Sequence, residues 1–288
     1  MENMRDIIVI TGPTASGKSK AATDLAQKIG GEIISADSLQ VYKYMDIGTA
    51  KEINPPVKHH LIDIITPGQK FSAADYVKHA QEAINNIPSH ITPIVAGGSG
   101  FYINALLYKT DLKSQNSDYL NFLNEKLENA GKEALHQMLV KVDAPYAEKV
   151  HFNNTRKVIR ALEYYYSHGK RLSDQKRGRK NYNITMYLLD LPRHILYEKI
   201  NNRVDLMLEK GLVREVENLV KMGYANTLPL QSIGYKEILK YLNREYTLDE
   251  AREKIKQNTR RFAKRQLTWF KNKTEAQPVN LQSLLLIY

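Results

Sequence analysis

The chain has 288 residues, of which 42% are hydrophobic and 25% charged, and its formal net charge is +11. This composition is typical of a globular protein, and the length allows one large α/β domain with an insertion or two domains. The absence of cysteine excludes disulfides, thiol nucleophiles and cysteine-bound zinc. The surplus of positive charge favours a polyanionic partner.

A phosphate-binding loop follows the first predicted element, a buried strand over residues 6–11. The loop consists of Gly12, Pro13, Thr14, Ala15, Ser16, Gly17, Lys18 and Ser19. It matches G-x-x-x-x-G-K-[ST] at every position, a motif whose backbone N–H groups surround phosphate oxygens. Lys18 adds positive charge, Ser19 can bind Mg²⁺, and the helix predicted over 20–29 directs its positive end at the same anion. The segment therefore predicts a phosphate or diphosphate site.

Asp37 lies at the carboxyl end of the second predicted strand, over residues 32–38. In open α/β sheets this end faces the ligand, so Asp37 is expected beside the P-loop. The same residue also suits a helix cap or a turn, and its position alone favours neither role. The polar and aromatic segment 39–51 is typical of a loop that faces a substrate.

A glycine pair ends another predicted strand, over residues 91–96, which follows a strand over 59–64 and a helix over 71–86. P-loop proteins that hydrolyse nucleotides usually place a metal-supporting Asp here. Gly97 and Gly98 stand in that place, which weakens an ATPase interpretation, and Asp63 is a candidate for a displaced substitute. The pair His59 and His60 does not predict a metal site, because neighbours on a strand point to opposite faces.

A helical insertion is predicted over residues 113–183, with helices over 118–129, 132–142 and 154–166. A strand over 184–191 then rejoins the sheet. The predicted fold is α/β, a P-loop NTPase-like parallel sheet core (1–112 and 184–288) carrying a helical insertion domain (113–183). Between residues 151 and 183 the sequence has nine basic residues and only two acidic ones, Glu163 and Asp174. This surplus of positive charge predicts an anion-binding surface. The nine are Arg156, Lys157, Arg160, Lys170, Arg171, Lys176, Arg177, Arg179 and Lys180.

The C-terminal part is predicted to be helical, with helices over 193–210, 213–222 and 252–273 and a loop over 228–237 that enters a further helix. The last helix carries nine basic residues against Glu253 alone. Its helical spacing puts Arg261, Lys264 and Arg265 on one face and Phe262, Gln266 and Trp269 on another. The aromatics are expected mostly in the core and the cations on a functional surface that contacts phosphates.

Seven segments together resemble the tRNA dimethylallyltransferase family (isopentenyl-pyrophosphate:tRNA transferases). They are GPTASGKS (12–19), SADSLQVY (35–42), MDIGTAK (45–51), VAGGSGFY (95–102), RALE (160–163), IGY (233–235) and AKRQLTWF (263–270). The P-loop alone is shared by many functions, so the resemblance rests on the order and spacing of all seven. It covers nearly the whole chain.

The resemblance implies transfer of a dimethylallyl group from dimethylallyl diphosphate to N6 of the adenosine immediately 3′ of the anticodon, in tRNAs that read codons starting with U. The P-loop would hold the diphosphate leaving group instead of ATP, with Mg²⁺, the implied cofactor, on Ser19. Asp37 would act as general base. Ser99, where the family usually has threonine, and Lys18 would act near the reacting centre.

The resemblance also implies the residues that contact the anticodon stem-loop of tRNA. The adenine must leave the stacked loop to react, and the Asp37 segment would face it. The implied set is Asp37, Ser38, Leu39, Gln40, Arg156, Lys157, Arg160, Gln231, Gly234, Tyr235, Lys236, Lys264, Arg265, Gln266, Trp269 and Lys271. The chain departs from the family at 151–154 and at Lys157, positions that bear on tRNA contacts. We expect a cytoplasmic, bacterial-type monomer without a membrane segment.

Three other interpretations remain open on the residues alone. A small-molecule P-loop kinase would share the phosphate loop and the strand-end Asp, but it accounts for neither basic cluster nor for Gly97 and Gly98. A prenyltransferase acting on free AMP or ATP would not need the basic insertion. A non-enzymatic RNA-binding module would not need an intact Lys18 and Ser19 with Asp37 nearby.

Overall fold

The computed structural model describes residues 4–109, 116–175 and 178–288, and the chain forms two compact units. One unit comprises Met1–Lys109 and Lys180–Tyr288, and the other comprises Thr110–Arg179. The insertion expected over 113–183 overlaps the second unit. Its expected start, together with Lys176 and Arg177, lies outside the described residues.

The first unit is built on a parallel sheet in which the described strands follow the order β3-β2-β4-β1-β5-β6. The strands are β1 (Asp6–Thr11), β2 (Glu32–Ser35), β3 (His59–His60), β4 (Pro93–Gly97), β5 (Asn183–Leu189) and β6 (Gln277–Val279). β1 is central because its apolar run is buried on both faces, as parallel sheets require. The predicted α/β class and parallel sheet are confirmed.

Helices cover both faces of this sheet. α1 (Lys18–Ile29) and α11 (Leu281–Ile287) pack on one face, against alternate strand residues such as Ile8 and Ile10. α2 (Ala73–Asn86) and α3 (Gly100–Leu107) pack on the other, against Ile7 and Val9. α2 begins at a capping box, which Ser72 forms with Asp75.

The predicted strand over 59–64 is wrong beyond its first two residues. β3 ends at His60 because the backbone takes positive φ angles at Leu61 (64°) and Asp63 (55°), which extended strands do not allow. His60 Nε2 lies 2.6 Å from Glu32 Oε2, and His59 Nδ1 lies 3.0 Å from Val57 O, so both histidines have protein partners.

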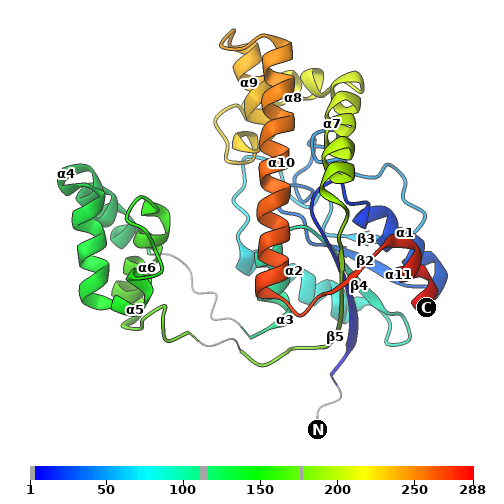
Figure 1. Cartoon of the computed structure of the whole chain (residues 1–288), viewed down its shortest axis with the longest axis horizontal. Helices are drawn as coiled ribbons and strands as arrows, with labels where there is room; N and C mark the ends of the chain where they lie inside the picture. Colours follow the sequence, from blue (N-terminus) through cyan, green and yellow to red (C-terminus); the bar gives the residue numbers. More distant parts are fainter. Residues whose placement is uncertain (1–3, 110–115, 176–177) are drawn as a thin grey trace. The chain divides into compact units, whose positions relative to one another are not determined.

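The C-terminal helices form a second layer that packs on the segment after β2. They are α7 (Arg193–Glu209), α8 (Leu212–Lys221), η1 (Pro229–Gln231), α9 (Tyr235–Leu242) and α10 (Leu248–Lys273). α10 begins earlier than predicted because Thr247 and Glu250 form a capping box. It runs beside α7 and α9 and reaches α3 with its last turns (Figure 1). Val41 and Met45 are buried among Leu212, Tyr235 and other residues of these helices.

The second unit is helical and has its own core. It contains α4 (Ser117–Val142), α5 (Ala144–Ala147) and α6 (Thr155–His168). Gly131 (φ 81°) interrupts α4, as the two predicted helices require. Glu163 is fully buried and accepts hydrogen bonds from Asn116 N (2.9 Å) and Arg160 Nη1 (2.5 Å). Across the described residues of the chain, no helix has the length and hydropathy needed to cross a membrane.

Candidate active site

A cavity of about 370 Å³ lies at the carboxyl ends of the strands, between the sheet and the C-terminal helices. The P-loop, the segments after β2 and β4, the loop 48–50, α7, the loop before α9 and α10 all line it. This is the edge at which parallel α/β sheets bind ligands. The predicted site residues in the lining are Thr14, Lys18, Ser19, Asp37, Ser38, Leu39, Gln40, Ser99, Gln231, Gly234 and Gln266.

The P-loop has the backbone shape that anion binding needs. Gly17 has φ 89° and forms the N-cap of α1, a conformation that glycine adopts without strain. Thr14 N donates a hydrogen bond to Gln266 Oε1 (2.8 Å), and Gln266 Nε2 donates to Gly98 O (3.0 Å). Gln266 is buried. One side chain of α10 therefore joins the P-loop to the segment after β4.

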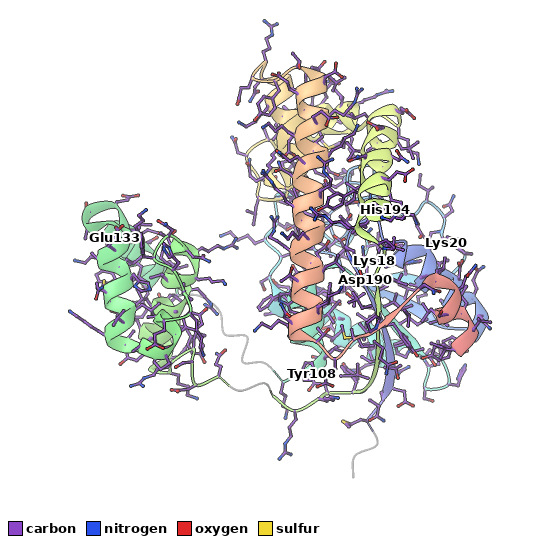
Figure 2. All side chains as sticks on the ribbon, viewed as in Figure 1. Lys18, Lys20, Tyr108, Glu133, Asp190 and His194 are labelled. Carbon is purple, nitrogen blue, oxygen red and sulfur yellow. The ribbon has the colours of Figure 1, made fainter. Side chains whose placement is uncertain are left out.

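Three charged groups influence one another in the cavity. Burial lowers the pKa of Lys18 to about 8, the Arg203 guanidinium acts in the same direction, and Asp37 opposes both. Burial also lowers the pKa of Arg203, again opposed by Asp37. Figure 2 marks Lys18 at the start of α1. Two partly desolvated cations beside one carboxylate leave a surplus of positive charge, which suits an anionic ligand.

Hydrogen bonds hold Asp37 in place at the end of β2. Its Oδ1 accepts from Leu39 N (2.9 Å), and Ser38 N donates to Ser99 Oγ (3.2 Å). In the described part of the chain no donor occupies Asp37 Oδ2, so this oxygen can meet a ligand. Gly97 permits the close approach of β4, since a Cβ there would lie 2.1 Å from Ala36 O. The glycine in the place of a metal-supporting Asp is thus required by packing.

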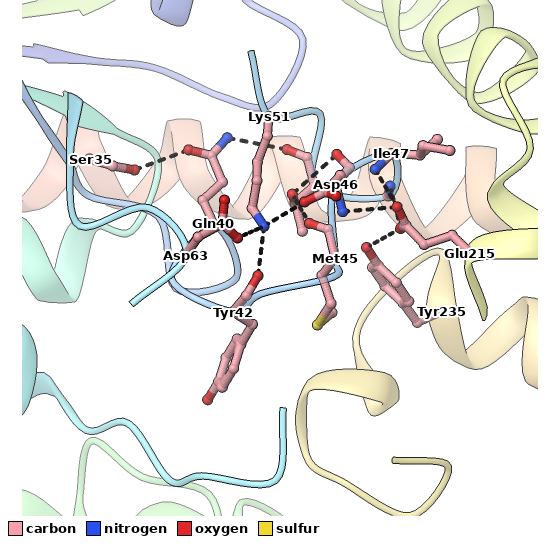
Figure 3. Close-up of polar contacts among 12 residues, drawn as sticks. Ser35, Gln40, Tyr42, Met45, Asp46, Ile47, Lys51, Asp63, Glu215 and Tyr235 are labelled. Atoms are coloured by element: carbon pink, nitrogen blue, oxygen red, sulfur yellow. Dashed lines mark hydrogen bonds and ion pairs between the residues drawn. The ribbon is translucent and has the colours of Figure 1, made fainter. Parts of the chain in front are cut away.

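A buried lysine orders the loop that forms another wall of the cavity. Lys51 Nζ donates to Tyr42 O (2.6 Å), Asp46 Oδ1 (2.8 Å) and Asp63 Oδ1 (2.6 Å), and its side chain is 4% exposed (Figure 3). Asp63 does not line the cavity. The suggestion that Asp63 substitutes for a metal-supporting Asp is therefore wrong, because its carboxylate pairs with Lys51.

Several predicted contact residues lie outside the cavity lining and have protein partners. Tyr235 is fully buried and its hydroxyl donates to Glu215 Oε1 (2.7 Å). The Trp269 ring packs where a Cβ of Gly100 would stand. Lys271 forms an ion pair with Asp190 (2.6 Å), and Lys236 lies 3.8 Å from Glu237. In this conformation both aromatic residues pack against neighbouring residues, and neither lines the cavity.

The remaining predicted contact residues are basic and at least partly exposed. Lys264 and Arg265 are exposed on α10 in the first unit. Arg156 and Lys157 are exposed on α6 in the second unit, where Arg160 is half-buried beside Glu163. The P-loop residues Gly12, Pro13, Ala15, Ser16 and Gly17 shape the loop without lining the cavity.

Arg203 was not predicted as a site residue, although the sequence of α7 carries a signal for it. In the predicted helix over 193–210, Ile200, Val204 and Met207 form an apolar stripe, and Arg203 lies on the same face at helical spacing. All four line the cavity. A cation on an apolar stripe is the feature that would have identified it. Gly48, Thr49 and Ala50 were not predicted individually as site residues, but they belong to the segment 39–51 that was expected to face a substrate, and they line the cavity.

The cavity thus joins two kinds of surface. Lys18, Arg203 and the P-loop amides suit a diphosphate, and the α7 stripe, with Ile255 and Phe262 of α10, offers apolar side chains. No group of three potential metal-binding side chains (His, Cys, Asp or Glu) occurs among the described residues. A metal here would therefore take most of its ligands from the bound anion and water, with Ser19 as a protein ligand.

The chain is similar to proteins of one family, both in sequence and in structure. Residues 40–273 match the IPP transferase family. A tRNA dimethylallyltransferase of Acetivibrio thermocellus is 49% identical over 93% of this chain and 89% of its own length. The solved full-length tRNA isopentenylpyrophosphate transferase of Bacillus halodurans is 39% identical, with a TM-score of 0.74 over 99% of this chain and 94% of that one. A eukaryotic dimethylallyltransferase acting on tRNA has a TM-score of 0.81 at 29% identity, over 96% of this chain and 74% of that one.

Proposed function

This chain belongs to the IPP transferase family, that of the tRNA dimethylallyltransferases, and we propose that it transfers a dimethylallyl group from dimethylallyl diphosphate to tRNA. The acceptor is N6 of the adenosine immediately 3′ of the anticodon, in tRNAs that read codons starting with U. The observation that carries the proposal is a cavity lined by both Lys18 and Arg203 and by an apolar stripe of α7. A donor that is half diphosphate and half hydrocarbon fits both surfaces.

In the proposed reaction, N6 attacks C1 of the dimethylallyl group while the bond from C1 to the diphosphate oxygen breaks. The diphosphate leaves with the electron pair, and N6 loses one proton. Lys18, Arg203 and the P-loop amides stabilise the negative charge that develops on the leaving oxygen. Asp37 Oδ2 receives the proton. Ser99 supports this geometry through its hydrogen bond with Ser38 N (3.2 Å).

Magnesium fits this site as a cofactor. The Ser19 hydroxyl lies at the start of α1 and lines the cavity, so it can bind an ion held by the diphosphate. When bound, Mg²⁺ neutralises charge on the diphosphate and makes it a better leaving group. The protein's own contribution is the loop that positions both.

The basic surfaces are proposed to bind the anticodon stem-loop. Lys264 and Arg265 on α10 and Arg156 and Lys157 on α6 are exposed cations, which suit contacts to phosphates. Gln40, Gln231 and the backbone at Gly234 line the cavity and would face the extruded adenine.

One assay tests the proposed function. The purified protein is incubated with unmodified tRNA, Mg²⁺ and labelled dimethylallyl diphosphate, and the labelled nucleotide is located after digestion. We expect label on N6 of the adenosine next to the anticodon. Transfer to free AMP with equal efficiency would favour the nucleotide prenyltransferase alternative. Phosphorylation of a small metabolite by ATP, without prenyl transfer, would contradict the proposal.

The lowered pKa of Lys18 predicts a pH dependence for donor binding. Below about pH 8 Lys18 is protonated and attracts the diphosphate, and above it the charge is lost. We therefore expect kcat/KM for dimethylallyl diphosphate to fall as the pH rises from 7 to 9, with a midpoint near 8. In Lys18→Arg the charge persists through this range, so its lower activity should be flat. A flat wild-type profile would show that the titration of Lys18 does not control donor binding.

A further inference from the structure

We infer that Glu215 of α8 is a positioning residue that holds the cavity wall formed by Gly48, Thr49 and Ala50. The inference rests on the proposed function only for its activity readout. Glu215 itself is half-buried and lies outside the cavity lining. It acts through the loop 46–48, with which it forms the contacts drawn in Figure 3.

Four hydrogen-bond donors converge on the two carboxylate oxygens of Glu215. Oε2 accepts from Asp46 N (2.9 Å) and Ile47 N (2.6 Å), and Oε1 accepts from Gly48 N (3.1 Å) and Tyr235 OH (2.7 Å). Three successive backbone amides that point to one place form an anion-binding concavity, and an ionised carboxylate has the acceptor positions for all four donors. A neutral side chain could not satisfy this set.

Tyr235 holds the same loop in a second way. A Cβ at Gly48 would lie 2.5 Å from the Tyr235 ring, so the absence of a side chain lets the ring pack directly against the loop. Burial, followed by the nearby Glu215, raises the pKa of Tyr235, so its hydroxyl remains a donor. The Tyr235 ring limits how closely the loop can pack at Gly48, and the Glu215 carboxylate orients the backbone N–H groups of residues 46–48.

The loop transmits this position to the acceptor side of the cavity. Thr49 O accepts a hydrogen bond from Gln40 Nε2 (3.3 Å), and Gln40 Oε1 accepts from Ser35 Oγ (3.0 Å). Because a carbonyl only accepts, Thr49 O determines which end of the Gln40 amide points towards it. Gln40 follows Asp37 by three residues and lines the same cavity. Glu215 thereby orients a group that would face the adenine, whereas the P-loop is held separately by Gln266.

The test compares Glu215→Gln with Glu217→Gln, a matched change on α8 outside this network. A glutamine has one acceptor oxygen, and an N–H₂ group replaces the second oxygen. Some of the four donors therefore lose their acceptor. We expect kcat to fall about 10- to 100-fold through misplacement of the acceptor, while the Kd of dimethylallyl diphosphate stays within about twofold of wild type, since the phosphate loop keeps its contacts. Amide hydrogen exchange over 45–51 should become faster. Glu217→Gln should behave as wild type.

Tyr235→Phe separates positioning from a general loss of structure. Alone it should lower kcat less than Glu215→Gln does, because it removes one of the four donors. Combined with Glu215→Gln it should cause little further loss, because both changes act on one contact. The inference would be overturned if Glu215→Gln kept the wild-type kcat and the wild-type rate of amide hydrogen exchange over 45–51. It would also be overturned if the affinity for dimethylallyl diphosphate fell by as much as kcat. An inactive wild type would instead reject the proposed function, and hydrogen exchange would still test the loop contact.

Discussion

Replacing Asp37 with asparagine is expected to lower kcat for tRNA prenylation by about 10³-fold, within the range that general base catalysis contributes. The asparagine keeps an oxygen for the hydrogen bond from Leu39 N (2.9 Å), so the turn after β2 should persist. What is lost is the oxygen that receives a proton from N6. Single-turnover rates with saturating tRNA and donor measure the loss.

The matched control for Asp37→Asn is Asp24→Asn, which removes a carboxylate on α1 that does not line the cavity. We expect wild-type turnover for this control. The Kd of tRNA, measured with Asp37→Asn, should change little, since the variant retains the shape and hydrogen bond of the residue. A variant that binds tRNA poorly but transfers the prenyl group normally once saturated would assign Asp37 to binding and not to catalysis.

Replacing Lys18 with methionine is expected to lower kcat/KM for dimethylallyl diphosphate by about 10²- to 10³-fold, as for the loss of one preorganised group that stabilises developing charge. In the described part of the chain, Lys18 and Arg203 are the cations that line the cavity, so the substitution removes one of the two positive charges proposed to bind the diphosphate. Methionine keeps the length and apolar contacts of the lysine stem. Steady-state kinetics with the donor varied measure the effect.

Lys20→Met provides the comparison for Lys18→Met. Lys20 lies two residues further along α1, and Figure 2 labels both lysines. The exposed side chain of Lys20 pairs with Asp24 (3.0 Å) and does not line the cavity. It carries the same charge, so a general electrostatic effect on tRNA or donor would appear in both variants. We expect Lys20→Met to retain wild-type kinetics. Equal losses in the two variants would mean that net charge matters and that the specific contact of Lys18 with the diphosphate does not.

Local signals in the sequence predicted most of the sheet and the phosphate loop. The P-loop motif, the apolar run before it and the helix predicted over 20–29 all depend on neighbours within a few residues, and the structure has β1, the loop and α1 at these places. The strand predicted beyond His60 is wrong for a reason that is not local. The backbone has positive φ angles at Leu61 and Asp63, and Asp63 N and Ile64 N donate to Gln40 O and Val41 O, contacts that the local residue pattern does not reveal. Amphipathic spacing identified α7 and α10 as helices.

Long-range contacts decided the rest of the site. Glu215 binds Gly48 N across 167 residues, and Gln266 binds Thr14 N across 252. No periodicity or motif specifies such pairs, because each side chain alone is an ordinary polar residue on a helix. Arg203 is an intermediate case. Helical spacing places it on the apolar face of α7, but the sequence does not show that this face lines a cavity. Trp269 and Tyr235 show the opposite case. The family motifs implied that they contact tRNA, and in the structure their rings pack against Gly100 and Gly48.

The order of the amino acids predicts a phosphate loop between a buried strand and a helix, an acidic residue at the next strand end, and the ordered motifs of one family. These features depend on residues that are close together in the sequence, so they can be recognised without knowing how distant segments pack. Packing of distant segments decides which cations line the cavity, which glycines admit a neighbouring backbone or ring, and which carboxylate holds the loop 46–48. Those choices depend on burial and on donors brought together from distant segments, because desolvation and hydrogen-bond geometry exist only once the chain has packed.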